Sequence, residues 1–211
     1  MEHERLWVQQ AQAGDQTAFA QLVAAYQGPV YNLAYRMLGN PVDAEDAAQE
    51  TFLRAYDRLA TYEPDRKFSS WILSIASHYC IDQLRRRRVP FDSLDDMPPG
   101  RELPSEADAP EEVALAREQE RALQRALALL PPAYRLPVIL RYWNELSYEE
   151  IAEATQTTVS AIKSRLHRAR LMLAEHMQAG EHAEEHARPT LTSTSPSMPP
   201  KGPMTHALRA S

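Results

Sequence analysis

Residues 158–170 combine hydroxyl and cationic side chains at helical spacing, a chemistry suited to contacting nucleic acid. Apolar residues recur at three- and four-residue steps, so we expect a helix that buries one stripe. That stripe comprises Val159, Ile162, Leu166, Ala169 and Leu173. The polar residues of the opposite face and its flanks are Ser160, Lys163, Ser164, Arg165, His167, Arg168 and Arg170. Short hydroxyls can approach base edges, and long cations can reach phosphates or guanine. An ordinary surface helix with a solvated basic face is the alternative interpretation.

The residues that precede this basic helix predict a second helix that would position it. Ser147 and Glu150 have the spacing of a capping box, in which each side chain bonds the backbone N–H of the other residue. We expect a helix over 148–154, a turn over 155–157, and Thr158 as the cap of the basic helix. Such an arrangement is a helix-turn-helix, whose second helix enters the major groove of DNA.

The composition fits a globular protein of one large or two small domains. The 211 residues are 44% hydrophobic and 25% charged, which is ordinary for such a protein. The single cysteine, Cys80, excludes an intramolecular disulfide and fits a reducing cytosol, and its apolar surroundings favour a core residue over a nucleophile. The N-terminus is acidic without an apolar run, and no stretch of about 18 apolar residues occurs, so we expect a cytoplasmic protein without membrane insertion.

Charge is segregated along the chain, whose formal net charge is −6. Four arginines occupy 85–88, and residues 159–174 hold four Lys or Arg without an acid. Between them, residues 91–120 carry ten acids against two arginines. Four prolines and few apolar residues lie in 91–110, and such a composition favours an extended chain. We therefore expect a flexible acidic linker between two basic surfaces.

The predicted fold class is all-α, with two small helical domains joined by this linker, the second of them containing the helix-turn-helix. The predicted boundaries are 1–90 for the first domain, 91–112 for the linker and 113–178 for the second domain. The composition of residues 179–211, which turns to Pro, Ser, Thr and charge, predicts a disordered tail.

In the first domain, Asp15 is expected to cap a helix that breaks at Gly28-Pro29 and resumes until Gly39. Asp43 is expected to cap the next helix, over 44–56, with acids in its first turn. The apolar residues assigned to the inner face of this helix are Ala48, Phe52, Tyr56 and Leu59. The polar residues assigned to its outer face are Asp46, Gln49, Glu50 and Asp57, which alone would indicate only a solvated surface.

Residues 68–88 predict a longer helix that interleaves aromatic rings with a terminal run of arginines. Ile72, Ile75, Ala76 and Tyr79 make its core stripe. Phe68, Trp71, His78 and the arginines offer rings to stack on and charge to follow a backbone, which is what a protein needs to hold unstacked bases. The alternative interpretation is that the rings belong to the core and the arginines form a polar helix end.

The second domain opens with a helix predicted from about Pro110 to Leu130. Its apolar side comprises Val113, Leu115, Leu123, Leu127 and Leu130. A short apolar segment over 134–143 follows, and Pro137 within it predicts a kink. Asn144 and Glu145 are expected to form a turn.

Two groups of motifs, in this order along the chain, resemble a known family. Asp43–Phe52 and Ser70–Ala76 resemble the N-terminal domain of the extracytoplasmic-function (ECF) sigma factors of bacterial RNA polymerase. Leu130–Pro132, Leu146–Glu153 and Ile162–Arg170 resemble their C-terminal domain. The resemblance covers roughly residues 5–178. It implies a transcription initiation factor that binds core RNA polymerase, directs it to promoters and promotes DNA melting, with no catalytic residue and no cofactor of its own.

The resemblance also implies the roles of individual residues. Those that match the surface docking on the clamp of the large polymerase subunit are Asp46, Gln49 and Glu50. Those that match the part holding melted bases of the minus-ten element are Lys67, Phe68, Ser69, Ser70, Trp71, His78, Arg85, Arg86, Arg87 and Arg88. Those that match the readers of the minus-thirty-five element are Ser160, Lys163, Ser164, Arg165 and Arg168. The implied partners are core polymerase, promoter DNA and an anti-sigma factor, and the linker resembles the segment that threads the polymerase channel.

Three features depart from the family pattern. His78 stands where Asn is common beside the flipped-base pocket, which bears on the preferred minus-ten base. Gln156 replaces the usual glycine of the turn, so that either Gln adopts a left-handed conformation at a cost of about 1 kcal/mol or the turn differs. Ala154 and Ala161 replace larger or hydroxyl residues, which bears on packing and base preference near the recognition helix.

Two other functions are compatible with parts of the sequence. A helix-turn-helix regulator that does not recruit polymerase would leave the 43–56 motif unexplained. His182, Glu185 and His186 match the H-x-x-E-H pattern of zinc peptidases, but a catalytic zinc needs a third ligand and a rigid cavity, whereas this stretch adjoins the expected disordered tail.

Overall fold

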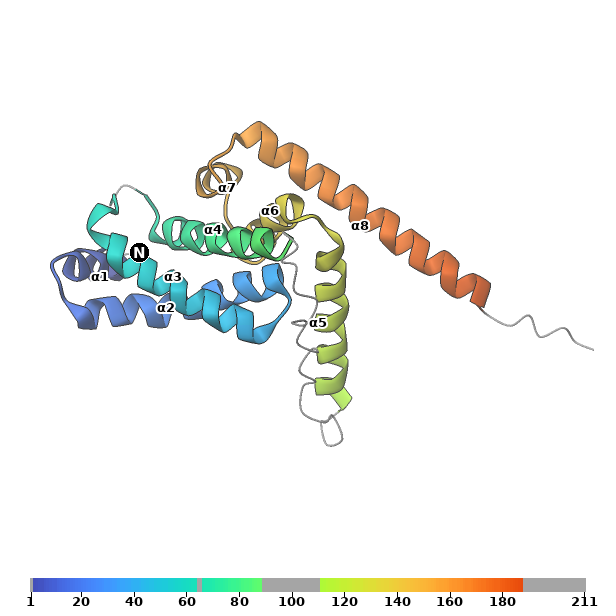
Figure 1. Cartoon of the computed structure of the whole chain (residues 1–211), viewed down its shortest axis with the longest axis horizontal. Coiled ribbons are helices and arrows are strands. Elements are labelled where there is room, and N and C mark those ends of the chain that lie inside the picture. Colours follow the sequence, from blue (N-terminus) through green and yellow to red (C-terminus); the bar gives the residue numbers. More distant parts are fainter. Residues whose placement is uncertain (1, 64–65, 89–110, 188–211) are drawn as a thin grey trace, which may run out of the picture. The chain divides into compact units, whose positions relative to one another are not determined.

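The computed structural model describes residues 2–63, 66–88 and 111–187 (Figure 1). The regular structure of these residues is helical, which confirms the predicted all-α fold class. The elements in chain order are α1 (Glu2–Gln12), α2 (Gln16–Leu38), α3 (Pro41–Arg58), the 3-10 turn η1 (Leu59–Thr61), α4 (Phe68–Arg88), α5 (Glu111–Leu129), α6 (Pro132–Tyr142), α7 (Tyr148–Ala154) and α8 (Val159–Ala187). None of the helices in the described ranges is long and apolar enough to cross a membrane.

Helix α2 is longer than the sequence predicts. Asp15 caps it as expected, because Oδ1 accepts hydrogen bonds from the N–H groups of Thr17 at 2.8 Å and Ala18 at 3.2 Å. The predicted break at Gly28-Pro29 is wrong, since α2 continues through Pro29 to Leu38. Pro29 is exposed, so the carbonyl that lacks its N–H partner can be hydrated and the helix tolerates the ring. Gly39 then ends the helix at a φ of 76°, with its N–H bonded to the carbonyl of Tyr35.

Helix α3 begins earlier than predicted. Its cap is Asn40, whose Oδ1 accepts from the N–H of Val42 at 2.9 Å, and Pro41 occupies the first turn. Asp43 therefore lies inside the first turn and is not the cap. The buried face is also displaced from the predicted one, because Tyr56 is 48% exposed. The fully buried residues of α3 are Ala44, Ala47, Thr51 and Ala55.

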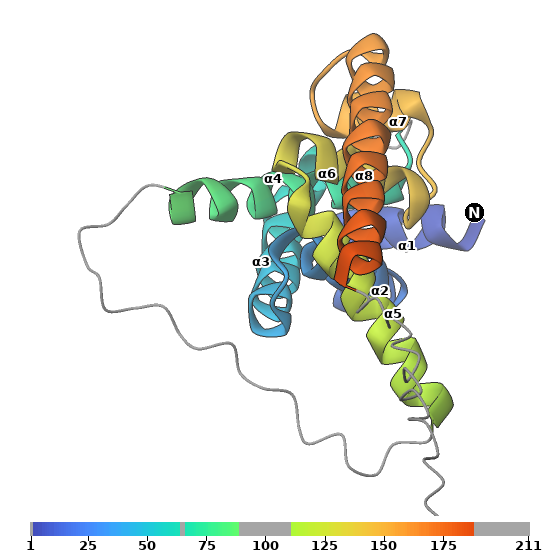
Figure 2. The same cartoon turned by 90° about the vertical axis from the view of Figure 1, so that its right-hand side faces the viewer.

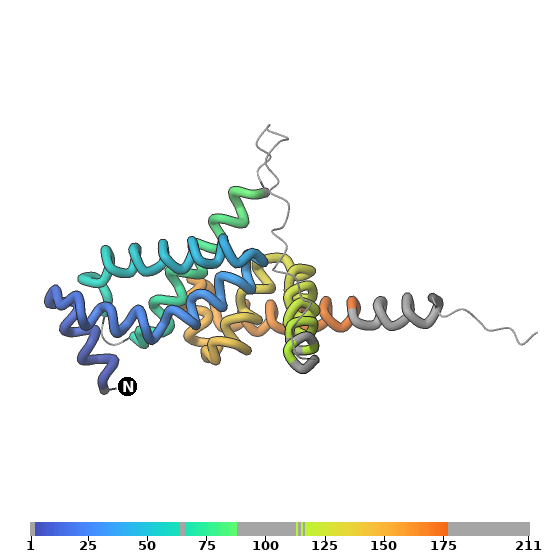
Figure 3. The backbone as a smooth tube through the Cα atoms, turned by 90° about the horizontal axis from the view of Figure 1, so that it is seen from below, coloured from blue at the N-terminus to red at the C-terminus, as the bar shows by residue number. Residues whose placement is uncertain are grey.

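Helices α2, α3 and α4 pack against one another and form the centre of the N-terminal half. Figure 3 shows α2 and α3 side by side, and Figures 1 and 2 both show α4 lying across them. The small residues of α3 allow this close approach, while α2 and α4 contribute the larger buried side chains. Helix α1, for which the sequence analysis predicted no element, is held by Gln12, whose Nε2 donates to the carbonyls of Leu59 at 2.9 Å and Tyr62 at 3.0 Å.

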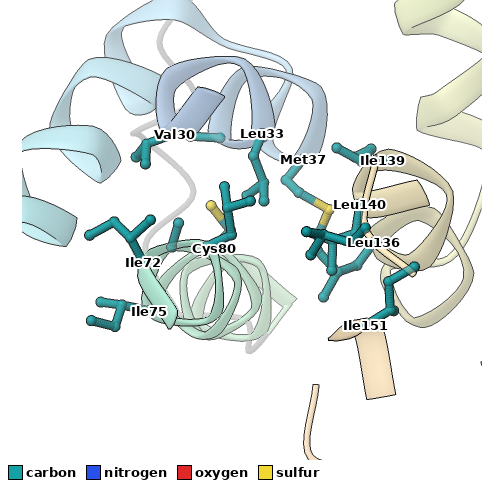
Figure 4. Close-up of a cluster of buried hydrophobic side chains, with 14 of the residues drawn as sticks. Val30, Leu33, Met37, Ile72, Ile75, Cys80, Leu136, Ile139, Leu140 and Ile151 are labelled. Atoms are coloured by element: carbon teal, nitrogen blue, oxygen red, sulfur yellow. The ribbon is translucent and has the colours of Figure 1, made fainter. Parts of the chain in front are cut away.

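The C-terminal half joins the same hydrophobic core through α6. Figure 4 shows Leu136 and Leu140 of α6 close to Met37 at the end of α2, and Ile151 of α7 beside them. Pro137 is buried, and α6 runs through it from Pro132 to Tyr142. Leu127 and Leu130 are buried as predicted, but the earlier residues of the predicted apolar side are not, since Val113 is 41% and Leu115 61% exposed.

The described residues bear only in part on the predicted domain boundaries. Residues 91–110 of the predicted linker lie outside the described ranges, and α5 begins at Glu111. The chain divides into two compact units, Met1–His176 and Met177–Ser211. Helix α8 continues to Ala187, so residues 179–187, which were expected to be disordered, are helical. Residues 188–211 of the predicted tail are outside the described part.

Candidate nucleic-acid interface

The predicted helix-turn-helix is formed by α7, a short turn and α8. The capping box is present in both directions: the N–H of Glu150 donates to Ser147 Oγ at 3.1 Å, and the N–H of Ser147 donates to Glu150 Oε2 at 2.7 Å. The turn closes with the N–H of Thr157 bonded to the carbonyl of Ala152 at 2.8 Å. Gln156 has a φ of 52°, so the left-handed conformation that its position suggested is the one it adopts. The predicted helix-turn-helix is therefore confirmed, and of the two possibilities left open for Gln156 the structure has the left-handed one.

Helix α8 buries one stripe and leaves its basic face open. Thr158 caps it, with Oγ1 accepting from the N–H of Ala161 at 3.2 Å. The buried stripe comprises Ile162, Leu166 and Ala169. The predicted DNA-contacting residues that are exposed are Ser160, Lys163, Ser164 and Arg168, and Arg165 is half-buried. The apolar face of α8 is therefore packed against the rest of the protein. The exposed face carries the hydroxyls and cations that a groove contact needs.

The aromatic rings predicted at the beginning of α4 do not form an exposed surface. Phe68 is 2% exposed and packs with ring centres 5.2 Å from Tyr26, 5.6 Å from Tyr62 and 5.4 Å from Trp71. Phe68 is therefore a core residue, as the alternative interpretation held. Trp71 is half-buried, and its other ring contact is with Tyr62 at 5.1 Å.

The remaining predicted residues at this end of α4 vary in exposure. Lys67 is exposed and Ser69 is half-buried. Ser70 is buried, and its Oγ has no hydrogen-bond partner among the described residues. Of Phe68 and Trp71, the two rings predicted at this end of α4, Trp71 is the one that retains an accessible part.

A polar pocket lies beside Trp71 and His78. Its cationic lining comprises Arg54, Arg58 and Arg66, none of which the sequence analysis selected. Arg54 and Arg58 are four residues apart near the end of α3. Two basic residues at this spacing share one face of a helix, and this is the sequence signal that could have revealed them. His78 is exposed, and its Nδ1 lies 2.7 Å from the carbonyl oxygen of Ser74. Cations and a ring together suit an anionic, base-bearing ligand.

The arginine run at the end of α4 is partly engaged within the protein. Arg87 Nη2 lies 2.6 Å from Asp43 Oδ1, which ties α4 to the first turn of α3. Arg85 Nη1 lies 3.8 Å from Asp82 Oδ1. Arg86 is exposed, and the side chain of Arg88 is outside the described residues. The run thus has a structural role at Arg87 as well as a cationic surface.

The outer face of α3 carries the residues expected to dock on polymerase. Asp46 and Gln49 are exposed, and Glu50 Oε1 accepts from Arg54 Nε at 2.7 Å. Two large apolar side chains extend the same helix surface: Leu53 is 63% and Tyr56 48% exposed. The residues lining the shallow groove at this place are Gln16, Phe19, Val23, Gln49, Phe52, Leu53, Tyr56 and Asp57. Sequence periodicity had assigned Tyr56 to the interior.

No metal or thiol chemistry is supported in the described residues. They contain no cluster of three His, Cys, Asp or Glu side chains that could hold a metal ion. Cys80 is buried, and desolvation raises the pKa of its thiol to about 12, which makes it a poor nucleophile. The side chains of His182, Glu185 and His186 lie outside the described part, so the zinc-peptidase pattern is not tested.

Comparisons with known proteins agree with the two halves of this site. The Sigma-70 region 2 family matches residues 22–89, and the Sigma-70, region 4 family matches residues 120–173. The ECF RNA polymerase sigma factor SigW of Bacillus subtilis is 36% identical over 178 residues, covering 81% of this chain and 95% of that protein. The ECF RNA polymerase sigma factor SigE of Mycolicibacterium smegmatis is 35% identical over 179 residues, covering 83% of this chain and 68% of that protein.

Among solved structures, CnrH in complex with the cytosolic domain of CnrY matches with a TM-score of 0.64 and 28% identity, over 84% of this chain and 98% of that one. This structural match covers both the N-terminal and the C-terminal half of the chain. Together with the two family matches and the paired helical halves described above, these similarities show that the chain belongs to the ECF sigma factors, transcription initiation factors that bind RNA polymerase and are not enzymes.

Proposed function

We propose that this sigma factor divides promoter recognition and polymerase binding among three surfaces. The outer face of α3, with Asp46, Gln49 and Glu50, docks on core polymerase. The start of α4 and the adjoining arginines hold the melted minus-ten strand. The basic face of α8 reads the minus-thirty-five element. The observation that carries the proposal is the exposed polar face of α8 above a fully buried apolar stripe.

The polymerase contact is supported by the mixture of acidic, amide and apolar side chains on the outer face of α3. Acidic and amide side chains adjoin Leu53 and Tyr56, two large side chains that are 63% and 48% exposed. Exposed apolar groups beside a polar rim are typical of a protein-binding surface. The apolar groups would stabilise the complex because their area is removed from water on binding. The carboxylates would fix the orientation of the two proteins.

Co-purification with core polymerase tests this surface. Glu50→Lys and Leu53→Asp are expected to reduce the retained fraction at least about tenfold, since each places an unsuitable charge in a contact that excludes water. Glu45→Lys is the matched control, because Glu45 is exposed on the same helix but lies near Tyr31, on the side toward α2. Retention of both test variants at the level of the unchanged chain would show that α3 docks by another face or not at all.

The minus-ten contact is supported by the groups around the α4 pocket. Trp71 offers a ring face, Arg66 offers charge, and His78 offers a ring nitrogen at the rim, while the exposed Lys67 follows Arg66 in the chain. Bases that are removed from the stack need these groups to offset the stacking they lose. Phe68 packs against the rings of Trp71 and Tyr62, so its role is to position these rings.

The minus-thirty-five contact is supported by the different lengths of the polar side chains on α8. Ser160 and Ser164 are short and exposed, which suits direct approach to base edges, while Lys163 and Arg168 are long enough to contact phosphates. Run-off transcription with reconstituted holoenzyme over genomic fragments would identify the promoters. Loss of transcription in Arg168→Ala with core binding retained is the expected result.

We further propose an anti-sigma factor as a protein partner and the cytoplasm as the place of action. The similarity to CnrH, whose solved structure contains the cytosolic domain of CnrY, supports a partner of this kind. Affinity capture of the full chain from its native cells, followed by mass spectrometry, tests this. Recovery of core polymerase subunits without another stoichiometric partner would contradict the anti-sigma part of the proposal.

A further inference from the structure

Helix α1 holds the backbone of the short turn that follows α3. Gln12, the last residue of α1, donates from Nε2 to the carbonyl of Leu59 at 2.9 Å and to that of Tyr62 at 3.0 Å. These two carbonyls belong to the first residue of η1 and to the residue that follows η1. The carbonyl of Leu59 also accepts from the N–H of Tyr62 at 3.1 Å. One side chain of α1 therefore fixes the backbone at both ends of η1.

Tyr62 connects this backbone to the proposed minus-ten site. It is 6% exposed, and its ring centre lies 5.6 Å from that of Phe68 and 5.1 Å from that of Trp71. Its hydroxyl donates to the carbonyl of Arg66. Trp71 and Arg66 both line the polar pocket beside His78. The ring of Tyr62 therefore supports the tryptophan, and its hydroxyl holds the backbone of the arginine.

A second contact from α1 supports the same aromatic rings. The hydroxyl of Tyr26 donates to Glu4 Oε2 at 2.6 Å. The ring of Tyr26 packs edge-on against Phe68, with centres 5.2 Å apart and planes at 60°. Edge-to-face pairs have a preferred geometry, so they orient the rings as well as bury them. Because α1 contacts both α2 and η1, it constrains the rings that pack against Trp71 through two separate side chains.

We propose that Gln12 is a positioning residue for the minus-ten strand: through Tyr62 it holds the ring of Trp71 and the backbone of Arg66 where an unstacked base and its phosphate bind. This proposal rests on the minus-ten site proposed above. The carbonyls at the end of a helix have no partner within it, and Gln12 supplies one at η1. A ring that is already held in place loses less conformational freedom when a base stacks on it, so this support strengthens binding.

The test measures binding of single-stranded DNA to holoenzyme reconstituted from core polymerase and the full chain. The probe is a fluorescein-labelled, mixed-sequence DNA of about ten nucleotides, a length in the range of known single-strand sites, and core polymerase alone gives the background anisotropy. Gln12→Met removes the donor and keeps the length of the side chain. Gln10→Met is the matched control, because Gln10 is exposed on the same helix and its side chain forms no hydrogen bond within the described part of the chain.

Trp71→Leu, which keeps an apolar side chain in the packing and removes the ring, is expected to weaken binding about tenfold, and Gln12→Met about fivefold, since one stacked base contributes this much. In the Trp71→Leu chain, Gln12→Met should cost less than about twofold, because the ring that it positions is gone. A general loss of stability would weaken both chains equally. Gln12→Lys keeps a donor for the two carbonyls and should bind as tightly as Gln10→Lys, which adds the same charge on the exposed face.

The outcomes separate the positioning role from the site itself. Circular dichroism and retention on core polymerase check that each variant is folded and assembled. If Trp71→Leu weakens binding and Gln12→Met does not, or if the two losses add in the double variant, the minus-ten site stands and the positioning role is wrong. Failure of Gln12→Lys to restore binding would also remove the hydrogen bonds to the two carbonyls as the cause. If Trp71→Leu leaves the affinity unchanged, both proposals are wrong.

Discussion

The guanidinium carbon of Arg36 lies 4.9 Å from the centre of the Trp143 ring, so a cation of α2 stacks on the residue that ends α6. Its Nη2 also lies 3.3 Å from Glu120 Oε1 on α5. Arg36 is 8% exposed, and an arginine is rarely buried to this extent unless it is paired. One side chain therefore links α2 to α5 and to the end of α6, which lie far from α2 in the sequence, and it connects the N-terminal half to the C-terminal half.

Arg36→Ala is expected to lower the free energy of unfolding by about 2 kcal/mol, because it removes a desolvated cation–π contact and the packing of the long side chain. Urea denaturation measures this. Glu120→Gln is the control and should cost less than about 1 kcal/mol, since Glu120 is 44% exposed and remains hydrated. Equal losses in the two variants would show that the ion pair, and not the stacking, stabilises this link.

Gln156→Gly is expected to stabilise the chain. Gln156 has a φ of 52°, a region that costs an L-residue with a Cβ more than it costs glycine. After subtraction of the greater freedom of glycine in the unfolded chain, the gain should be about 0.5–1 kcal/mol in thermal or urea unfolding. Gln156→Ala retains the Cβ and should give no gain. A loss of stability in the glycine variant would mean that the side chain of Gln156 makes contacts worth more than the strain.

Arg168→Ala is expected to weaken binding to duplex DNA and to reduce its salt dependence. If Arg168 contacts one phosphate, the slope of log K against log salt concentration should fall in magnitude by about 1. Titration of mixed-sequence duplex with the full chain at several salt concentrations measures the slope. Arg117→Ala is the control, because Arg117 is an exposed arginine on α5, outside the proposed interface. An unchanged slope for Arg168→Ala would remove this residue from the phosphate contacts.

Cys80 is expected to be unreactive in the folded protein. Burial raises the pKa of its thiol from 9.0 to about 12, so at pH 9 it stays protonated while an exposed thiol would be half ionised. Ellman's reagent should therefore react with the native chain at the rate of unfolding, and rapidly once the chain is denatured. Rapid reaction of the native protein at pH 9 would show that α4 opens locally around Cys80.

Glu150 is expected to contribute to the loss of stability in acid. Its burial raises the pKa of the carboxyl, but the hydrogen bonds from Lys67 and Ser147 outweigh this, so the net shift is below the ordinary value of 4.5. A lowered folded pKa contributes stability above the unfolded value, and that stability is lost as the pH falls through the folded value. Glu150→Gln should therefore flatten the stability curve below pH 4.5. A steep acid limb in Glu150→Gln would assign the effect to other carboxylates.

The sequence by itself determined the elements that depend on neighbours along the chain. The caps at Asp15 and Thr158 and the capping box of Ser147 with Glu150 are formed within three residues, so their spacing was sufficient to predict them. The buried stripe of α8 follows for the same reason, because helical periodicity decides which side chains share a face.

The tertiary structure alone decided which of these faces meet. Periodicity does not reveal that α2 tolerates Pro29, that Phe68 is enclosed by Tyr26 and Tyr62, or that Tyr56 remains exposed. Each of these depends on side chains brought together from distant positions, whose contribution is unknown until the helices pack. The contact of Lys67 with Glu150 is the clearest case. Their chemistry is visible in the sequence, but only the shared core of α2, α4 and α6 places the carboxylate against the cation.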